Sequence, residues 1–195
     1  MNTPISLHLA STSPRRREIL AALEIDFDVA SVAVDETPLD GETPGDMVVR
    51  LAAAKAGAAV VGAADLALGA DTAVVIDGQA LGKPVDEADC LRMLALLSGR
   101  AHKVVTGVAL CGANKTRTAL SETDVYFREI SSDEALAYWQ SGEPCDKDGA
   151  YAIQGLGGVF VERIEGSYSN VVGLPVFETV ALLNDAGFEI LPRHE

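Results

Sequence analysis

The first group of chemically capable residues lies near the start of the chain, where hydroxyl and guanidinium side chains begin a predicted helix. In the run Ser11-Thr12-Ser13-Pro14-Arg15-Arg16-Arg17, Ser13 is placed as an N-cap and Pro14 at the first helical position. Hydroxyls and free backbone amides at a helix N-terminus form an anion site, which the helix dipole reinforces. Basic side chains are unfavourable in a first turn, so three arginines there indicate a negatively charged ligand such as a phosphate. The alternative is a basic turn that only faces water.

A carboxylate interrupts a strongly apolar stretch of the chain. Asp71 and Thr72 stand between the apolar segments Leu66–Ala70 and Ala73–Ile76, and a buried carboxylate is costly unless it is paired or bound to a metal. A carboxylate at the end of a strand, opening onto a cleft, suits a general base or a metal ligand. The alternative is an aspartate that only accepts hydrogen bonds from a neighbouring loop.

Three further charged residues gain meaning only together with these. Glu36 ends a predicted strand in a turn, Lys55 interrupts the apolar part of a predicted helix, and Lys83 sits in a tight Gly-Lys-Pro turn. Each alone is typical of a surface charge. The glycine-rich segment Glu143–Gly155 is a further candidate, because loops of this length inside a compact domain are often functional.

Several common active-site patterns have no support in the sequence. The segment Gly78–Pro84 has three residues between its glycines instead of four, and proline follows its lysine, so it is not a P-loop. The run Gly155–Gly157 is not completed to G-x-G-x-x-G, because Phe160 stands at the third glycine position. The histidines lie in unrelated contexts, which gives no support to a Ser–His–Asp triad or a zinc site, and each is predicted to be structural or exposed. They are His8, His102 and His194.

The elements that must position these residues alternate between strand-like and helix-like patterns, with hairpins between some of the strands. This alternation predicts an α/β fold with a mixed central sheet flanked by helices, in a single domain over residues 1–195. The predicted strands are Ile5–Leu9, Phe27–Val32, Ala67–Ile76, Ala80–Leu81, Lys103–Leu110, Thr118–Phe127 and Val159–Arg163. The predicted helices are Pro14–Leu23, a long one launched at Thr43, Asp86–Ser98, Ser132–Gly142 and Pro175–Ala186, with a loop running through Asn170.

The composition limits the partners of the protein. The 195 residues include 15 Lys and Arg against 29 Asp and Glu, a net charge of −14, which repels polyanions. We therefore expect neither nucleic acid nor an anionic membrane as a partner. No signal peptide or membrane span is recognised, and three cysteines, an odd count, fit a reducing compartment, so a cytoplasmic protein is predicted. They are Cys90, Cys111 and Cys145, predicted to be structural.

Taken together and in order, these residues resemble the Maf family of nucleoside triphosphate pyrophosphatases. The resemblance runs from Leu7 to about Glu178, and its seven ordered motifs are jointly specific although each alone is weak. The motifs are Ser11-x-Ser13-Pro14-Arg15-Arg16, Val34-Asp35-Glu36, Lys55-Ala56, Gly69-Ala70-Asp71-Thr72, Gly82-Lys83-Pro84, His102-x-Val104-x-Thr106-Gly107, and the block from Asp146-Lys147 to Gln154-Gly155.

Within that family the chain is similar to the dTTP/UTP branch. The 7-methyl-GTP branch carries Ser-Glu-Gly where this chain has Ile153-Gln154-Gly155. The resemblance implies hydrolysis of a nucleoside triphosphate, with dTTP and UTP favoured, at the α–β bond to the monophosphate and pyrophosphate. It also implies a mixed sheet between two lobes, related to the inosine triphosphatase fold, with the nucleotide in the cleft.

The resemblance assigns roles residue by residue. Asp71 falls on the proton acceptor of the family, and Glu36 and Asp71 would hold a divalent cation (Mg²⁺ or Mn²⁺), activate water or divide these tasks. Cytoplasmic location and a homodimer are also implied. The specificity positions fall on Arg15, Thr72 and Gln154, and the residues that line the triphosphate and metal region fall on Ser11, Arg16, Glu36, Lys55 and Lys83.

Two alternatives remain open at this level. A purine-directed enzyme that removes inosine or modified triphosphates would use the same class of site, and a substrate panel separates the two. A nucleotide-binding regulator of septum formation would keep the cations without needing Asp71, so the presence of Asp71 favours an enzyme.

Overall fold

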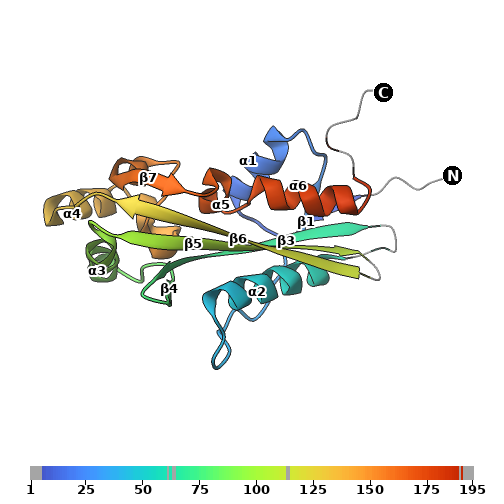
Figure 1. The fold of residues 1–195 in the computed structure, drawn as a ribbon, viewed down its shortest axis with the longest axis horizontal. Helices are drawn as coiled ribbons and strands as arrows, with labels where there is room; N and C mark the ends of the chain where they lie inside the picture. The colour runs from blue at the N-terminus through green and yellow to red at the C-terminus, as the bar shows by residue number, and fades with distance from the viewer. Residues whose placement is uncertain (1–5, 61, 63–64, 113–114, 189, 191–195) are drawn as a thin grey trace.

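The computed structural model of the protein describes residues 6–60, 62, 65–112, 115–188 and 190. Seven strands form one sheet in the order β2-β1-β3-β5-β6-β7, and β4 pairs with the end of β3 that lies away from β1 (Figure 1). Together with the flanking helices, this mixed sheet confirms the predicted fold class. The strands are β1 (Leu7–Leu9), β2 (Asp28–Val29), β3 (Leu66–Ile76), β4 (Gln79–Leu81), β5 (Ala101–Gly112), β6 (Lys115–Phe127) and β7 (Val161–Glu165).

The sheet is mixed because two kinds of connection build it. β1 pairs in parallel with β2 and with β3, and parallel neighbours need crossovers, which here contain α1 (Pro14–Ala22) and α2 (Pro44–Ala59). β5 pairs with both β3 and β6 in antiparallel register, from Ala101 opposite Tyr126 to Gly112 opposite Lys115 in the β5–β6 hairpin. Ile5 of the predicted first strand, residues 113–114 of the predicted turn, and His194 lie outside the described residues.

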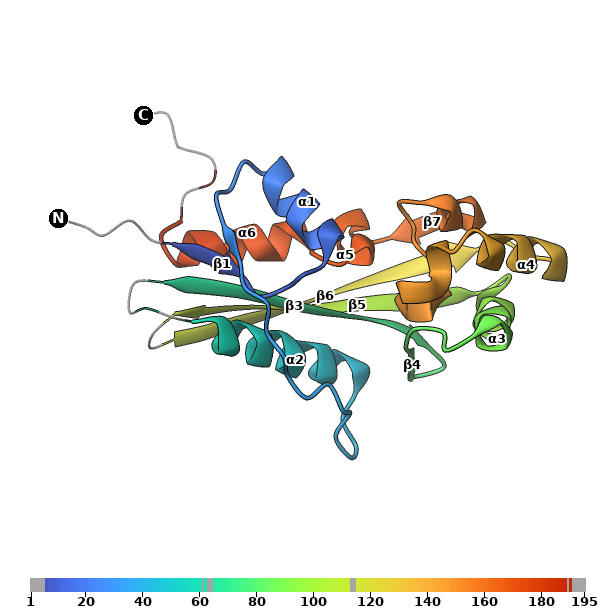
Figure 2. The ribbon, with the colours of Figure 1, turned by 180° about the vertical axis from the view of Figure 1, so that it is seen from behind.

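The helices cover the sheet unequally. In Figures 1 and 2, α2 packs on one face of the sheet, whereas α1, α5 (Tyr168–Val172) and α6 (Val176–Asp185) lie on the other. α3 (Glu87–Leu97) and α4 (Ser132–Gln140) lie against each other near the far ends of the long strands. The three long strands β3, β5 and β6 therefore run through both halves of the molecule.

Two separate apolar cores correspond to the two predicted lobes. One core contains Leu9, Leu20, Leu68 and Leu110 with side chains of α6. The other contains buried residues of α3 and α4 with Val74, Val104 and Phe127. β3 and β5 contribute to both cores, so the middle of β3, where Asp71 lies, falls between the two lobes.

Local capping fixes several helix starts where the sequence predicts them. The Thr43 hydroxyl accepts the N–H of Asp46 at 3.2 Å and begins α2, and the Asp86 carboxylate accepts the N–H of Asp89 at 2.8 Å and begins α3. Ser13 is the N-cap of α1 as predicted, but its side chain makes no capping hydrogen bond. Its N–H instead donates to the Ser11 hydroxyl at 3.3 Å.

Two glycines allow α2 to lie directly on the sheet. A β-carbon at Gly69 of β3 would lie 2.2 Å from the carbonyl oxygen of Ala52, and one at Gly107 of β5 would lie 2.4 Å from that of Val48. Both contacts are with helix backbone, which cannot rotate away. The close approach brings Lys55 of α2 beside Asp71 of β3.

Several predicted elements differ from the structure, and three of these differences have a clear physical reason. β2 covers only Asp28–Val29 of the predicted Phe27–Val32, because it is an exposed edge that pairs only with the three-residue β1. The last strand is Val161–Glu165 rather than Val159–Arg163, because Leu156–Phe160 forms a 3₁₀ helix. The predicted loop through Asn170 contains α5, which the Ser167 hydroxyl caps by accepting the N–H of Asn170.

Within the described part of the chain, none of the helices combines the length and apolarity needed to cross a membrane.

Candidate active site

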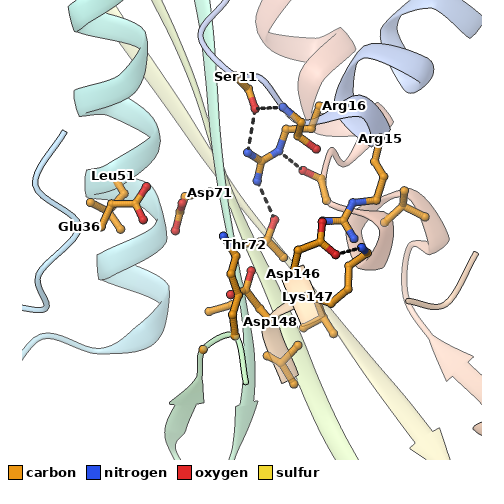
Figure 3. A pocket seen from close by; sticks show the side chains of 18 of the residues that line it. Ser11, Arg15, Arg16, Glu36, Leu51, Asp71, Thr72, Asp146, Lys147 and Asp148 are labelled. Carbon is orange, nitrogen blue, oxygen red and sulfur yellow. Dashed lines mark hydrogen bonds and ion pairs between the residues drawn. The ribbon is translucent and has the colours of Figure 1, made fainter. Parts of the chain in front are cut away.

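A cavity of about 620 Å³ opens between the two lobes, beside the middle of β3. Its walls come from the loop before α1, the segment before α2, the β4 turn and the glycine-rich segment 146–154 (Figure 3). The structure brings every predicted site residue to this cavity. They are Ser11, Arg15, Arg16, Glu36, Lys55, Asp71, Thr72, Lys83 and Gln154.

At the α2 side of the cavity, one ammonium group joins two carboxylates. Lys55 Nζ lies 2.7 Å from Asp71 Oδ1 and 2.6 Å from Glu36 Oε1. The Lys55 and Asp71 side chains are 14% and 15% exposed, whereas Glu36 is 61% exposed on an irregular segment. Asp71 is therefore paired by an ion pair from α2, rather than by the neighbouring loop of the alternative prediction.

The two carboxylates differ electrostatically. Burial raises the pKa of Asp71 above its usual value, and this effect outweighs the opposing effects of Lys55 and Arg16. The hydrogen bond from Lys55 lowers the pKa of the more exposed Glu36. A half-buried carboxylate on a rigid strand is suited to take a proton at a fixed place, and an exposed carboxylate on a loop is free to follow a bound cation.

A divalent cation fits this donor set. Two carboxylates already converge on one positive nitrogen, and Mg²⁺ is typically held by one or two carboxylates, with phosphate oxygens and waters completing its ligands. Among the residues described, no three His, Cys, Asp or Glu side chains form a group that could hold a metal ion by themselves. The cavity therefore suits a cation that arrives with a phosphate ligand better than a cation caged by protein alone.

Arg16 forms the centre of the opposite wall. Its guanidinium donates to the Gly173 carbonyl at 2.8 Å, and to the hydroxyls of Ser11 and Thr72, each at 3.2 Å (Figure 3). Burial lowers the pKa of Arg16 from its very high ordinary value. The guanidinium is thus held in one orientation, facing the cavity.

A buried polar chain behind Thr72 was not predicted from the sequence. The Thr72 hydroxyl lies 3.0 Å from that of Thr106, which donates to the Asn170 carbonyl at 3.1 Å. The Asn170 amide donates in turn to the Val104 carbonyl and the Thr123 hydroxyl, both at 2.9 Å. Thr106 belongs to a recognised motif, but nothing in the sequence indicates that its partner comes from α5.

The segment at Asp146–Ala150 adds two carboxylates and a lysine to the cavity wall. Asp146 pairs with Lys147, and Gly149 N–H donates to the Gly82 carbonyl at 3.0 Å, which holds Asp148 near Lys83. Burial raises the pKa of Asp148, with Lys83 opposing. Asp148 was not among the predicted site residues, although it stands inside the recognised block.

Gln154 lies on an exposed part of the same wall. Across the described residues, its side-chain amide has no protein hydrogen-bond partner, so both its donor and its acceptor are available to a ligand.

The three cysteines and His102, which were not predicted to belong to the site, lie outside the cavity. Cys90 and Cys111 are buried, Cys145 is exposed, and none of the three lines the cavity. His102 is buried against Phe127, with its Nε2 at 2.9 Å from the Tyr151 hydroxyl, which fits the predicted structural role.

Comparisons with known proteins relate the chain to one family. A family model described as "Maf-like protein" matches residues 6–186. A Shewanella oneidensis protein named dTTP/UTP pyrophosphatase is 53% identical over 192 residues, covering 94% of this chain and 99% of the relative. A Vibrio vulnificus protein of the same name is 50% identical over 181 residues, covering 92% and 97%. A solved HAM1 protein from Coxiella burnetii gives a TM-score of 0.49 at 19% identity over 64% of this chain and 73% of that one.

Proposed function

The chain belongs to the Maf family, and on this premise we propose that it is a nucleoside triphosphate pyrophosphatase with a preference for dTTP and UTP. It hydrolyses the bond between the α- and β-phosphates and releases the nucleoside monophosphate and pyrophosphate. The observation that carries the proposal is the ion-paired group of Glu36, Lys55 and Asp71 in a cavity that Arg15 and Arg16 face from the other side.

The cations bind and orient the triphosphate, which carries about four negative charges. Arg16 is held in place by three protein acceptors and presents a fixed guanidinium, while Lys83 is exposed and adjustable at the β4 turn. Lys55 lies on the α2 side of the cavity and Arg15 on the opposite wall (Figure 3), so the polyanion binds between cations. We expect the α-phosphorus to lie beside Asp71.

Asp71 acts as the base. Its carboxylate accepts a proton from the water that attacks the α-phosphorus, the bond from that phosphorus to the bridging oxygen breaks, and the electron pair leaves with pyrophosphate. The arginines and lysines stabilise the charge that develops on the leaving group. Glu36 and Asp71 would hold a divalent cation, which when bound supplies Lewis-acid stabilisation of phosphate charge.

Gln154 reads the base. Its amide offers a donor and an acceptor, which match O4 and N3–H of uracil or thymine. Cytosine presents a donor at N4 and an acceptor at N3, so a fixed amide leaves groups unpaired against it. An unpaired buried group costs about 1–3 kcal/mol, or roughly 10- to 100-fold in kcat/KM. Arg15 and Thr72 are the other specificity positions that the family resemblance supports.

A substrate panel tests the proposal. The purified protein is incubated with Mg²⁺ and each of UTP, dTTP, CTP, GTP and inosine triphosphate, and the products are identified by chromatography. We expect UTP and dTTP to give monophosphate and pyrophosphate with similar kcat/KM, and the others to be at least about tenfold worse. Binding of nucleotides without hydrolysis would instead support the regulator, and preference for inosine triphosphate would support the purine-directed enzyme.

A matched pair of variants tests the base. Asp71→Asn should lower kcat by roughly 10²–10⁴ while the protein stays folded. Asp77→Asn alters an aspartate in the turn that follows the same strand, paired with Arg100 away from the cavity, and should leave kcat unchanged. Near-normal turnover by a folded Asp71→Asn protein would reassign the base to Glu36.

We also propose that residues 1–195 form one domain that assembles as a homodimer in the cytoplasm. The family resemblance supports the dimer, and the three free cysteines agree with a reducing compartment. Size-exclusion chromatography with light scattering measures the assembly directly, and a monomeric mass would contradict it.

A further inference from the structure

A tyrosine and a glutamate behind the cavity wall accept hydrogen bonds from the backbone on both sides of Gln154. Tyr138 is a buried residue of α4, and its hydroxyl accepts the N–H of Ala152 at 3.2 Å, two residues before Gln154. Glu143 accepts the N–H of Leu156 and of Gly157, each at 2.9 Å, two and three residues after it.

Tyr138 and Glu143 are also hydrogen-bonded to each other. The Tyr138 hydroxyl donates to Glu143 Oε1 at 2.7 Å, so a single hydrogen-bonded pair holds the backbone before and after Gln154. Burial, together with the Glu143 carboxylate, raises the pKa of the Tyr138 hydroxyl, which keeps its proton and remains a donor. Leu156 and Gly157 begin a 3₁₀ helix that has no side-chain cap of its own, and Glu143 supplies the negative charge at that end.

The packing around this pair leaves no room for a side chain at two glycines of the segment. A β-carbon at Gly155 would lie 2.2 Å from Glu143 Oε2, and one at Gly157 would lie 2.6 Å from the Tyr138 hydroxyl. The glycines thus let the backbone reach the two polar groups. The contacts fix the backbone and leave the Gln154 amide itself free to meet a ligand.

We propose that Tyr138 and Glu143 are positioning residues for base selectivity. This inference rests on the proposed function, in which Gln154 reads the pyrimidine edge. The Gln154 amide can turn about its own side-chain bonds to suit either uracil or cytosine, because it carries both a donor and an acceptor. The backbone N–H and C=O groups of Ile153 and Gln154, in the same cavity wall, cannot exchange roles in this way. Holding the backbone on both sides of Gln154 fixes where these groups and the amide meet the base, so the pair favours one pairing edge over the other.

The test removes each group and measures the ratio of kcat/KM for UTP to that for CTP. Tyr138→Phe deletes only the hydroxyl, and Glu143→Gln places an amide NH₂ where one of the two backbone N–H groups needs an acceptor. We expect the ratio to fall by about tenfold in Tyr138→Phe and by more in Glu143→Gln. The kcat for UTP should stay within about twofold while its KM rises, because the phosphate-binding residues are unchanged.

Tyr126→Phe and Glu134→Gln are matched controls. Tyr126 donates to Glu165 at 3.2 Å and Glu134 caps α4, and neither lines the cavity. Both controls should retain the wild-type ratio, and thermal unfolding checks that all four variants are folded. A folded Tyr138→Phe or Glu143→Gln protein with the wild-type ratio overturns the positioning role. A wild-type protein that does not discriminate UTP from CTP overturns the base-reading role of Gln154, and the positioning role with it.

Discussion

Adding one methyl group at Gly69 should push α2 away from the active site. The β-carbon of Gly69→Ala would start 2.2 Å from the Ala52 carbonyl oxygen and 2.7 Å from the Ala56 nitrogen, whereas real β-carbons stay beyond 3.0 Å of other heavy atoms. Relief requires an outward movement of α2 by about 0.8 Å, because both contacts are with helix backbone in a close-packed core. The movement carries Lys55 with it, on the same helix.

The magnitude follows from packing and from geometry. Overpacking a core costs about 1–3 kcal/mol, and we expect the upper end here because backbone has to move. The Lys55–Asp71 contact would lengthen from 2.7 Å to about 3.5 Å, beyond a good charged hydrogen bond. A misplacement of about 1 Å can cost 10²-fold in rate, so kcat should fall by at least about tenfold.

Gly57→Ala is the matched control. Gly57 is exposed on the same helix, and a β-carbon there meets nothing within 4 Å. We expect this variant to gain about 0.5–1 kcal/mol from helix propensity and to keep its turnover. The assays are urea unfolding and kcat with dTTP. A Gly69→Ala protein that matches wild type in both would refute the claim that this close approach positions Lys55.

Three other outcomes follow from the structure. Burial lowers the pKa of His102 to about 4, so below pH 6.5 the unfolded chain takes up a proton at this residue while the folded chain does not. The unfolding free energy should therefore fall by about 2 kcal/mol from pH 7 to pH 5. In urea unfolding, His102→Phe should lose that share of the pH dependence. Iodoacetamide should modify the exposed Cys145 first and leave turnover unchanged. Cys90 and Cys111 are buried, and burial raises the pKa of the Cys90 thiol to about 11. Inactivation that UTP prevents would place a thiol in the cleft. Gln154→Glu should weaken the preference for UTP over CTP through repulsion with uracil O4, and an unchanged ratio would remove Gln154 from base recognition.

Features encoded over short stretches could be predicted from the sequence. Thr43 and Asp86 cap the helices that they were expected to begin, and the long apolar run around Asp71 forms β3. These signals are local, because a cap needs only the next few residues and a strand needs only its alternation or apolarity. The same locality explains the error at β2, whose length depends on how many residues β1 offers as partners.

The contacts that organise the site are not local, and the sequence does not reveal them. Arg16 and its acceptor Gly173 are 157 residues apart, and Thr106 and Asn170 are 64 apart. Asp148 stands in a recognised block, but only its burial in the fold distinguishes it from its neighbours. Residue type identifies which groups can do chemistry, whereas partner choice depends on the whole fold.

The charges of the cavity show how an acidic protein can bind a polyanion. Three of its cations are held by internal partners: Lys55 by two carboxylates, Lys147 by Asp146, and Arg16 by neutral oxygens. These pairings avoid unpaired buried charge, which would be costly, but a ligand must then compete with Glu36 and Asp71 for Lys55. A ligand with a single negative charge gains too little to displace a carboxylate. A triphosphate that arrives with a divalent cation would offer Lys55 a new partner, and the cation would take the place of Lys55 beside both carboxylates. Lys55 and the two carboxylates would then each keep an oppositely charged partner. The cavity is therefore expected to favour a metal-bound triphosphate over a monophosphate product.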